Sequence, residues 1–210
     1  LAHGVSPSPD GARLVYSVVV VEDGEEITDV WTMQMDGQDK RLIHSVRGGV
    51  SCLSWSPNGS QILYVYQSIS GQFFPGELHL LNIDDSSDRL LATDLPMPGE
   101  SRYCPVWSPD DRYIAFVQLD SHPTFHPTLA LVPGNAYFVD TVTGRVVKLS
   151  SFENRDVTYP IWSPDGRFVA FVSITIPSGE QILPGELWVV STDGGQRYTL
   201  SGTVRWGNAL

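Results

Sequence analysis

One short signature occurs four times in this chain, and the repeat constrains the fold more than any other feature. Each copy reads Ser-Pro, then Asp or Asn, then Gly or Asp, and each precedes a short apolar run. The prolines of the four copies are Pro9, Pro57, Pro109 and Pro164, spaced 48, 52 and 55 residues apart. A period of about 20–50 residues is typical of solenoids, propellers and repeat arrays.

Apolar residues recur at fixed positions after each signature, which predicts a strand with one buried face. The position seven residues past the proline holds Tyr16, Tyr64, Phe116 and Phe171. The position two residues earlier holds Leu14, Ile62, Ile114 and Val169. Pro-Asp-Gly supplies turn chemistry, so each signature is predicted to be the hairpin that enters this strand. The strands that lead into the hairpins are predicted at residues 50–55, 103–107 and 158–162.

Two further strands are predicted in every repeat. The third contains an aromatic position occupied by Trp31, His79, Phe138 and Trp188. We interpret His79 as a packed core residue rather than a catalytic one, because it occupies an aromatic position. The fourth strands are predicted at residues 40–44, 89–93, 145–149 and 197–201.

Four strands in each repeat of about 50 residues predict an all-β fold, a β-propeller of four-stranded antiparallel blades. The sequence gives one propeller domain over residues 1–210. Its blades are predicted at approximately 1–48, 49–98, 99–154 and 155–201, with 202–210 beginning a further blade or closing the ring. We expect a piece of a larger propeller, because unpaired blade faces would expose apolar surface. A closed four-bladed ring is the alternative.

The repeat resembles the TolB-type, WD40-like β-propeller family. Trp162-Ser163-Pro164-Asp165-Gly166 and the strand after it carry the likeness, and so does the segment 187–195, Leu-Trp-Val-Val-Ser-Thr-Asp-Gly-Gly. The first copy departs from the pattern with Pro7 in place of tryptophan, and the third has Asp111 in place of glycine. The resemblance implies a propeller that is periplasmic, secreted or attached to a peptidase, with a function that is usually binding rather than chemistry.

Composition limits the partners. The formal net charge is −11 and no basic run is present, so nucleic acid is not expected. No apolar stretch reaches the ~20 residues of a membrane helix. We find no Gly-x-Ser-x-Gly, Walker loop or Gly-x-Gly-x-x-Gly, so we predict no enzyme activity and no cofactor. The predicted function is a noncatalytic interaction or scaffold module, and the alternative is the propeller domain of a prolyl-oligopeptidase-like peptidase or a carbohydrate-active protein.

Long connections between the second and third strands are the predicted binding surface. They are predicted at residues 22–29, 67–76, 119–134 and 174–185, all at the end of the blades opposite the Pro-Asp-Gly hairpins. Long loops on a rigid scaffold often carry binding residues. The candidate partner-binding residues are Phe73, Phe74, His122, Phe125, His126, Ile182 and Leu183. The alternative is that these loops pack on neighbouring blades.

Two groups of polar residues could be interpreted as metal sites. His122 and His126 have metal-ligand spacing for a helix, but Pro123 and Pro127 argue against a helix there, so we predict exposed loop histidines. The acidic segment 22–26 lacks the order of a calcium loop and is predicted to be a solvated hairpin tip.

Cys52 and Cys104 are the only cysteines, and each lies three residues before a repeat tryptophan. We favour two buried free thiols over a disulfide, because equivalent positions of adjacent repeats are expected to lie slightly too far apart for a bond.

Overall fold

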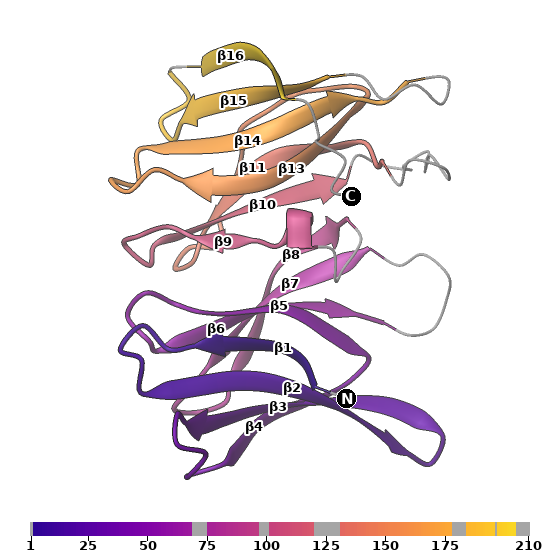
Figure 1. The fold of residues 1–210 in the computed structure, drawn as a ribbon, viewed down its shortest axis with the longest axis vertical. Helices are drawn as coiled ribbons and strands as arrows, with labels where there is room; N and C mark the ends of the chain where they lie inside the picture. The colour runs from indigo at the N-terminus through magenta and orange to yellow at the C-terminus, as the bar shows by residue number, and fades with distance from the viewer. Residues whose placement is uncertain are drawn as a thin grey trace. The chain divides into compact units, whose positions relative to one another are not determined.

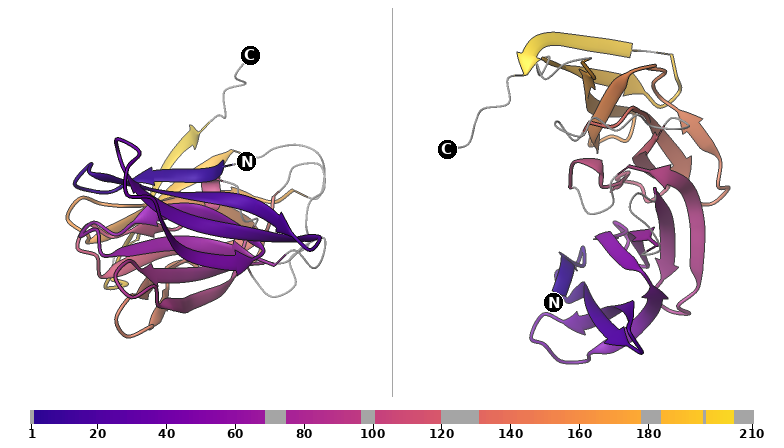
Figure 2. Two further views of the ribbon diagram at one scale, coloured as in Figure 1. Left: turned by 90° about the horizontal axis from the view of Figure 1, so that it is seen from below. Right: turned by 90° about the vertical axis from the view of Figure 1, so that its right-hand side faces the viewer.

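The computed structural model describes residues 2–68, 75–96, 101–119, 131–177, 184–195 and 197–204. The described chain forms four antiparallel sheets of four strands each (Figures 1 and 2). It divides into two compact units, Leu1–Trp107 and Ser108–Leu210. Within the described residues, no helix is long and apolar enough to cross a membrane. The all-β prediction of four-stranded antiparallel blades is confirmed.

The first unit contains two complete sheets, in each of which neighbouring strands are neighbours in the sequence. The first sheet consists of β1 (Ala2–Pro7), β2 (Arg13–Glu22), β3 (Glu25–Gln34) and β4 (Arg41–Arg47). The second consists of β5 (Gly49–Trp55), β6 (Gln61–Gln67), β7 (Gly76–Asn82) and β8 (Asp88–Leu95). A short 3₁₀ turn, η1 (Ser101–Tyr103), follows.

The remaining two sheets have the same strand order. The third consists of β9 (Val106–Trp107), β10 (Tyr113–Leu119), β11 (Gly134–Asp140) and β12 (Val146–Lys148). The fourth consists of β13 (Arg155–Trp162), β14 (Phe168–Thr175), β15 (Gly185–Ser191) and β16 (Arg197–Val204). The predicted fourth strands of all four repeats are therefore confirmed, with shifted ends.

The Ser-Pro-Asp-Gly signature forms the hairpin between the first and second strands, as predicted. In the first copy, the Gly11 N–H donates to the Ser8 carbonyl at 2.9 Å, and the Ser8 N–H donates to the Arg13 carbonyl at 2.8 Å. The other three copies make the same two bonds. The fourth residue has a left-handed φ, +69° at Gly166 and +62° at Asp111. Glycine and, less readily, aspartate tolerate that conformation.

The tryptophan before the signature connects neighbouring first strands in the first unit. Trp55 Nε1 donates to the Ser6 carbonyl at 3.0 Å, and Trp107 Nε1 donates to the Ser54 carbonyl at 3.5 Å. The Arg13 guanidinium also lies 4.8 Å from the ring centroid of Trp55. Each indole thus contacts the repeat before it.

The repeated apolar positions are buried to different extents in the first and second sheets. Ile62 in the second sheet is fully buried in one core cluster with Val15 and Val30 of the first sheet. The equivalent Leu14 and Tyr16 of the first sheet are only half-buried. The two faces of the first sheet therefore differ, since one packs on the second sheet and the other does not.

The third repeat corrects one predicted alignment. Tyr16 pairs with Trp31 and Phe171 with Trp188, but Phe116 pairs with Tyr137 rather than with Phe138. In the turn after β11 the Gly144 N–H donates to the Asp140 carbonyl, four residues earlier, whereas in the first sheet the Gly37 N–H donates to the Gln34 carbonyl, three residues earlier, and this extra residue shifted the sequence alignment by one. Phe138 points to the opposite face, where it contacts Tyr113 and Trp162 edge-on.

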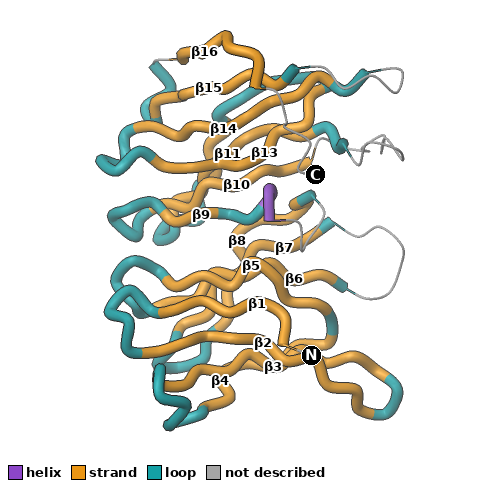
Figure 3. The backbone as a smooth tube through the Cα atoms, viewed as in Figure 1, coloured by secondary structure: helices purple, strands orange, loops and turns teal. Residues whose placement is uncertain are grey.

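The predicted long connection at residues 22–29 is wrong. β2 and β3 stay paired without interruption to Glu22 and Glu25, and only Asp23 and Gly24 lie between them (Figure 3). Both residues have positive φ, 52° and 82°, as a tight two-residue hairpin requires. Residues 18–22 and 25–29 extend the two strands instead. The acidic segment 22–26 is fully exposed, as predicted for a solvated tip.

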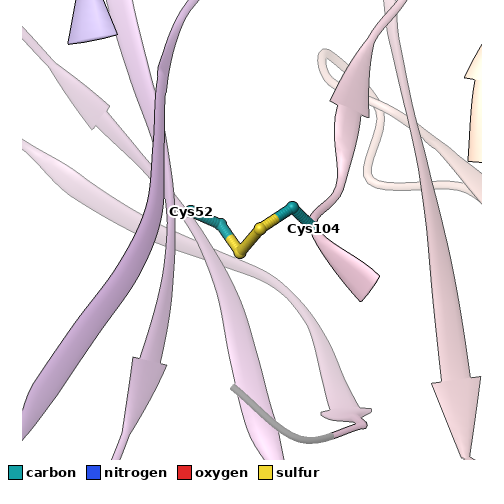
Figure 4. The surroundings of a disulfide bond; sticks show 2 residues. All are labelled: Cys52 and Cys104. Atoms are coloured by element: carbon teal, nitrogen blue, oxygen red, sulfur yellow. A yellow bond between two sulfur atoms is a disulfide. The ribbon is translucent and has the colours of Figure 1, made fainter. Parts of the chain in front are cut away.

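The strand predicted at 103–107 is shorter than expected, because Tyr103 ends the 3₁₀ turn and Pro105 has no N–H for a ladder. The prediction of free thiols is also wrong. Cys52 and Cys104 form a disulfide with their Cα atoms 5.4 Å apart (Figure 4). Cys52 lies in a bulge of β5 with φ +56°, where the register shifts between Ser51 and Ser54. The bulge changes the direction of the Cys52 side chain, which regular strand spacing did not anticipate.

Candidate functional site

In each unit, the candidate surface lies at the end of the sheets where the second strand connects to the third. Three of these connections are long, namely those joining β6 to β7, β10 to β11 and β14 to β15. All seven residues predicted to bind a partner belong to them and lie outside the described residues. The structure describes the bases of these loops, which are anchored on paired strands.

A hollow of about 170 Å³ lies at the base of the β6–β7 connection. Its lining consists of Tyr66, Ser68, Pro75, Glu77, Thr93 and Asp94. Tyr66 is held in place because its hydroxyl donates to the Arg47 carbonyl at 2.8 Å. Both charged groups of the lining are carboxylates, so the hollow favours a cationic or hydrogen-bond-donating group.

Glu77 joins the hollow to a cluster of polar side chains within the second sheet. His79 lies between two carboxylates, with Nε2 3.2 Å from Glu77 Oε2 and Nδ1 2.9 Å from Asp88 Oδ2. The Tyr64 hydroxyl donates to Asp88 Oδ1 at 3.0 Å, and His44 Nε2 is 3.2 Å from the same hydroxyl. The cluster therefore connects β4 with β6, β7 and β8.

Ring packing and hydrogen bonds in this cluster link the side chains of neighbouring strands. The rings of Tyr64 and His79 stack with centroids 5.1 Å apart, so His79 is packed as the sequence predicted. Burial and the Asp88 charge raise the pKa of Tyr64 far above its usual value, and its hydroxyl stays a donor. Burial lowers the pKa of His44, which favours neutral imidazole at neutral pH. Sequence reasoning missed His44, Tyr64 and Asp88 as partners, because the strand pairing that joins them is not visible in the repeat.

Metal binding has no support in the part of the chain that the structure describes. No three His, Cys, Asp or Glu side chains there are arranged to hold an ion. His122 and His126 lie outside that part.

These sheets and their connections define the class of protein, which is a β-propeller with a TolB-like fold. A structure described as TolB from Agrobacterium tumefaciens matches 93% of this chain and 63% of its own, with 24% identity and a TM-score of 0.57. TolB from Acinetobacter baumannii matches 94% of this chain and 44% of its own, with 17% identity and a TM-score of 0.58.

Propeller domains of enzymes match as well. The β-propeller domain of the Trilobed protease from Pyrococcus furiosus matches 97% of this chain and 57% of its own, with 11% identity and a TM-score of 0.63. Oligogalacturonate lyases and prolyl endopeptidases are also among the matching structures. No protein-family profile matches the chain. The chain thus spans about half the length of the propeller structures it resembles.

Proposed function

We propose that this chain is a noncatalytic binding module of a TolB-like propeller, which holds a protein partner through the loops at one end of its sheets. The observation that carries the proposal is the asymmetry between the two ends. The hairpin end has short turns closed by repeated hydrogen bonds, whereas three connections at the other end are long and carry apolar residues. Rigid sheets with long loops at one end are a common arrangement for recognition.

The acidic hollow at residues 66–94 supports a partner that brings a basic side chain to this end. Glu77 and Asp94 would pair with a lysine or arginine, and Phe73 and Phe74 of the adjoining loop would add apolar contact. Such a combination of an apolar centre and a charged rim is typical of protein interfaces.

We further propose that the four blades form part of a larger propeller. The half-buried residues Leu14, Tyr16, Trp31 and Met33 on the first sheet support this, because Ile62 and Tyr64 at equivalent positions of the next sheet are fully buried. A further blade, from the same chain or from a partner, would cover them.

The disulfide supports an extracytoplasmic location, periplasmic or secreted. Disulfides form and persist in oxidising compartments and are rare in the cytosol.

The propeller domain of an enzyme is the second candidate function. It is favoured by the matches to a protease propeller and to prolyl endopeptidases, of which the chain covers 57% and 29%. In that case the catalytic residues would lie on another part of the protein. Mass spectrometry of the natural protein distinguishes the two, because a much longer chain with a hydrolase domain would contradict the noncatalytic module.

Loop deletion tests partner binding directly. A variant in which a short Gly-Asn-Gly linker replaces residues 120–130 is produced in the source organism. The variant and the unaltered protein are each purified together with their associated proteins. We expect the partner to be lost while the unfolding midpoint is unchanged. A control shortens the turn at 84–86 at the opposite end of the second sheet, and should keep the partner. The proposal would be refuted if every partner were retained after the deletion of residues 120–130 and after similar deletions of 70–74 and 179–182.

A further inference from the structure

A second, larger pocket lies at the opposite end of the sheets, in the unit Ser108–Leu210. It has a volume of about 360 Å³, within the ~300–1,000 Å³ range of small-molecule sites. Its lining comes from the starts of β10, β12 and β16 and from the ends of β11 and β15, which are the hairpin ends of the third and fourth sheets. The turns at this end of the third and fourth sheets therefore connect the strands and also line the pocket.

The pocket is basic although the protein is acidic. Four of the thirteen Lys and Arg residues of the chain line it, against two carboxylates. The cations are Arg112, Arg145, Lys148 and Arg197, and the carboxylates are Asp140 and Asp193. With a formal net charge of −11 for the whole chain, this local excess of positive charge is the reverse of what composition predicts.

Both carboxylates are already satisfied by their own turns. Asp140 Oδ1 accepts the N–H groups of Val142 and Thr143, each at 2.9 Å, while its Oδ2 receives Arg112 Nε at 3.3 Å. Asp193 Oδ1 accepts the Ser191 hydroxyl at 2.6 Å and the Gly195 N–H at 2.9 Å. These bonds hold the pKa of each carboxyl below its usual value, so both carboxylates stay charged and the lining carries four cations against two anions.

The other three lining cations, Arg145, Lys148 and Arg197, form no salt bridge with a carboxylate among the described residues. Within the described ranges, Arg145 and Arg197 make no ion pair, and Lys148 Nζ lies 5.6 Å from the centroid of the Tyr137 ring. Tyr113 and Val147, which are half-buried, provide apolar wall beside them, whereas Phe138 and Val190 are buried. The site thus combines a surplus of donors for an anion with a surface for a flat apolar group.

We propose that this pocket binds a small organic phosphate, a phosphate monoester attached to a flat apolar group. A phosphate monoester carries a charge of about −1.5 to −2 at pH 7, and guanidinium groups bind its oxygens in pairs. Arg145 and Arg197 hold the phosphate, while Tyr113 and Val147 contact the apolar group. The site lies at the end opposite the loops proposed to bind the protein partner and does not depend on that proposal.

Isothermal titration calorimetry of the full chain with phenyl phosphate at pH 7.5 and low salt tests the site. We expect a Kd of about 1 mM or below. Inorganic phosphate should bind at least fivefold more weakly, and benzyl alcohol should not bind. Arg145→Gln with Arg197→Gln should weaken phenyl phosphate at least tenfold. The matched control, Lys40→Gln with Arg41→Gln, removes two exposed cations of the first unit and should change the Kd less than twofold.

Nuclear magnetic resonance on the unmodified chain provides a readout that does not require a folded variant. Phenyl phosphate should shift the amide signals of Gly194 and Val190 most strongly. Absence of binding, equal binding of inorganic phosphate, unchanged affinity of the Arg145→Gln/Arg197→Gln variant, or shifts confined to other residues would each overturn the proposal.

Discussion

The serine of each hairpin fixes the turn through its side chain as well as its backbone. Its Oγ accepts the N–H five residues on, at 2.9 Å for Ser8, 3.0 Å for Ser56, 2.8 Å for Ser108 and 2.9 Å for Ser163. The same hydroxyl donates to the Asp or Asn that follows the proline. Each signature residue thus has a physical role in the turn, which explains why four copies give one geometry.

Replacement of Gly166 tests the left-handed position of the fourth hairpin. Gly166→Ala should lower the free energy of unfolding by about 1 kcal/mol, because its φ of +69° is strained for alanine while the nearest atom, Pro109 Cδ, leaves room for a Cβ at 4.0 Å. The reverse change, Asp111→Gly at φ +62°, should raise the free energy of unfolding by a few tenths of a kcal/mol or more. Urea denaturation measures both, and equal effects of the two changes would contradict this account.

The hairpin carboxylates should make stability depend on acid pH. The Ser163 hydroxyl, the Arg167 N–H and the Arg167 side chain lower the pKa of Asp165 to about 2. Since the folded pKa lies below the unfolded value, Asp165 contributes stability above about pH 4, and this contribution is lost as the pH falls toward 2. The stability difference between the wild type and Asp165→Asn should therefore shrink over that range in urea denaturation. Asn58 already fills this position in the second hairpin, so Asn58→Ala is a control with no such pH dependence.

At the scale of elements, one bulge in the first strand of a sheet recurs three residues before the signature tryptophan position. Gly4, Cys52 and Tyr159 occupy it with φ values of 83°, 56° and 54°. In the second sheet it directs Cys52 toward Cys104, which precedes β9. The disulfide therefore links the first strand of one repeat to the segment that begins the next.

Removal of the disulfide should destabilise the first unit. Cys52→Ser with Cys104→Ser should lower the free energy of unfolding by about 2–4 kcal/mol, because a link across 52 residues restricts the unfolded chain. Denaturation of the wild type in reducing buffer should show a similar loss. The serine variant should be insensitive to reductant, and a variant as stable as the oxidised protein would contradict the expectation.

At the scale of the whole molecule, the arrangement of sheets decides which faces are buried, and in the first unit the first two sheets cover one face of each other. The cluster of Val15, Val30, Ile62 and Leu81 joins the first two sheets into one core. The far face of the first sheet, which carries Leu14 and Met33, receives no such cover within the first unit.

Alanine substitutions at equivalent positions of the first two sheets measure how much the covered face and the far face each contribute to stability. Ile62→Ala should cost about 2–5 kcal/mol, because it opens a cavity in a fully buried core. Leu14→Ala at the equivalent position should cost less than about 1.5 kcal/mol in the 210-residue chain, because Leu14 is only half-buried. Urea denaturation compares them within one unit. Equal costs would mean that the far face of the first sheet is covered.

The sequence by itself determined the fold class, the number of sheets and the position of the hairpins. Proline, aspartate and glycine act on their own backbone within a few residues, and alternation fixes which residues share a face, so these features are local. It did not determine the Cys52–Cys104 bond, the Phe116–Tyr137 pairing, the short β2–β3 turn or the basic pocket at Arg145 and Arg197. Each of these depends on a bulge, a turn length or the approach of separate sheets, and such distances are set only when the strands pack together.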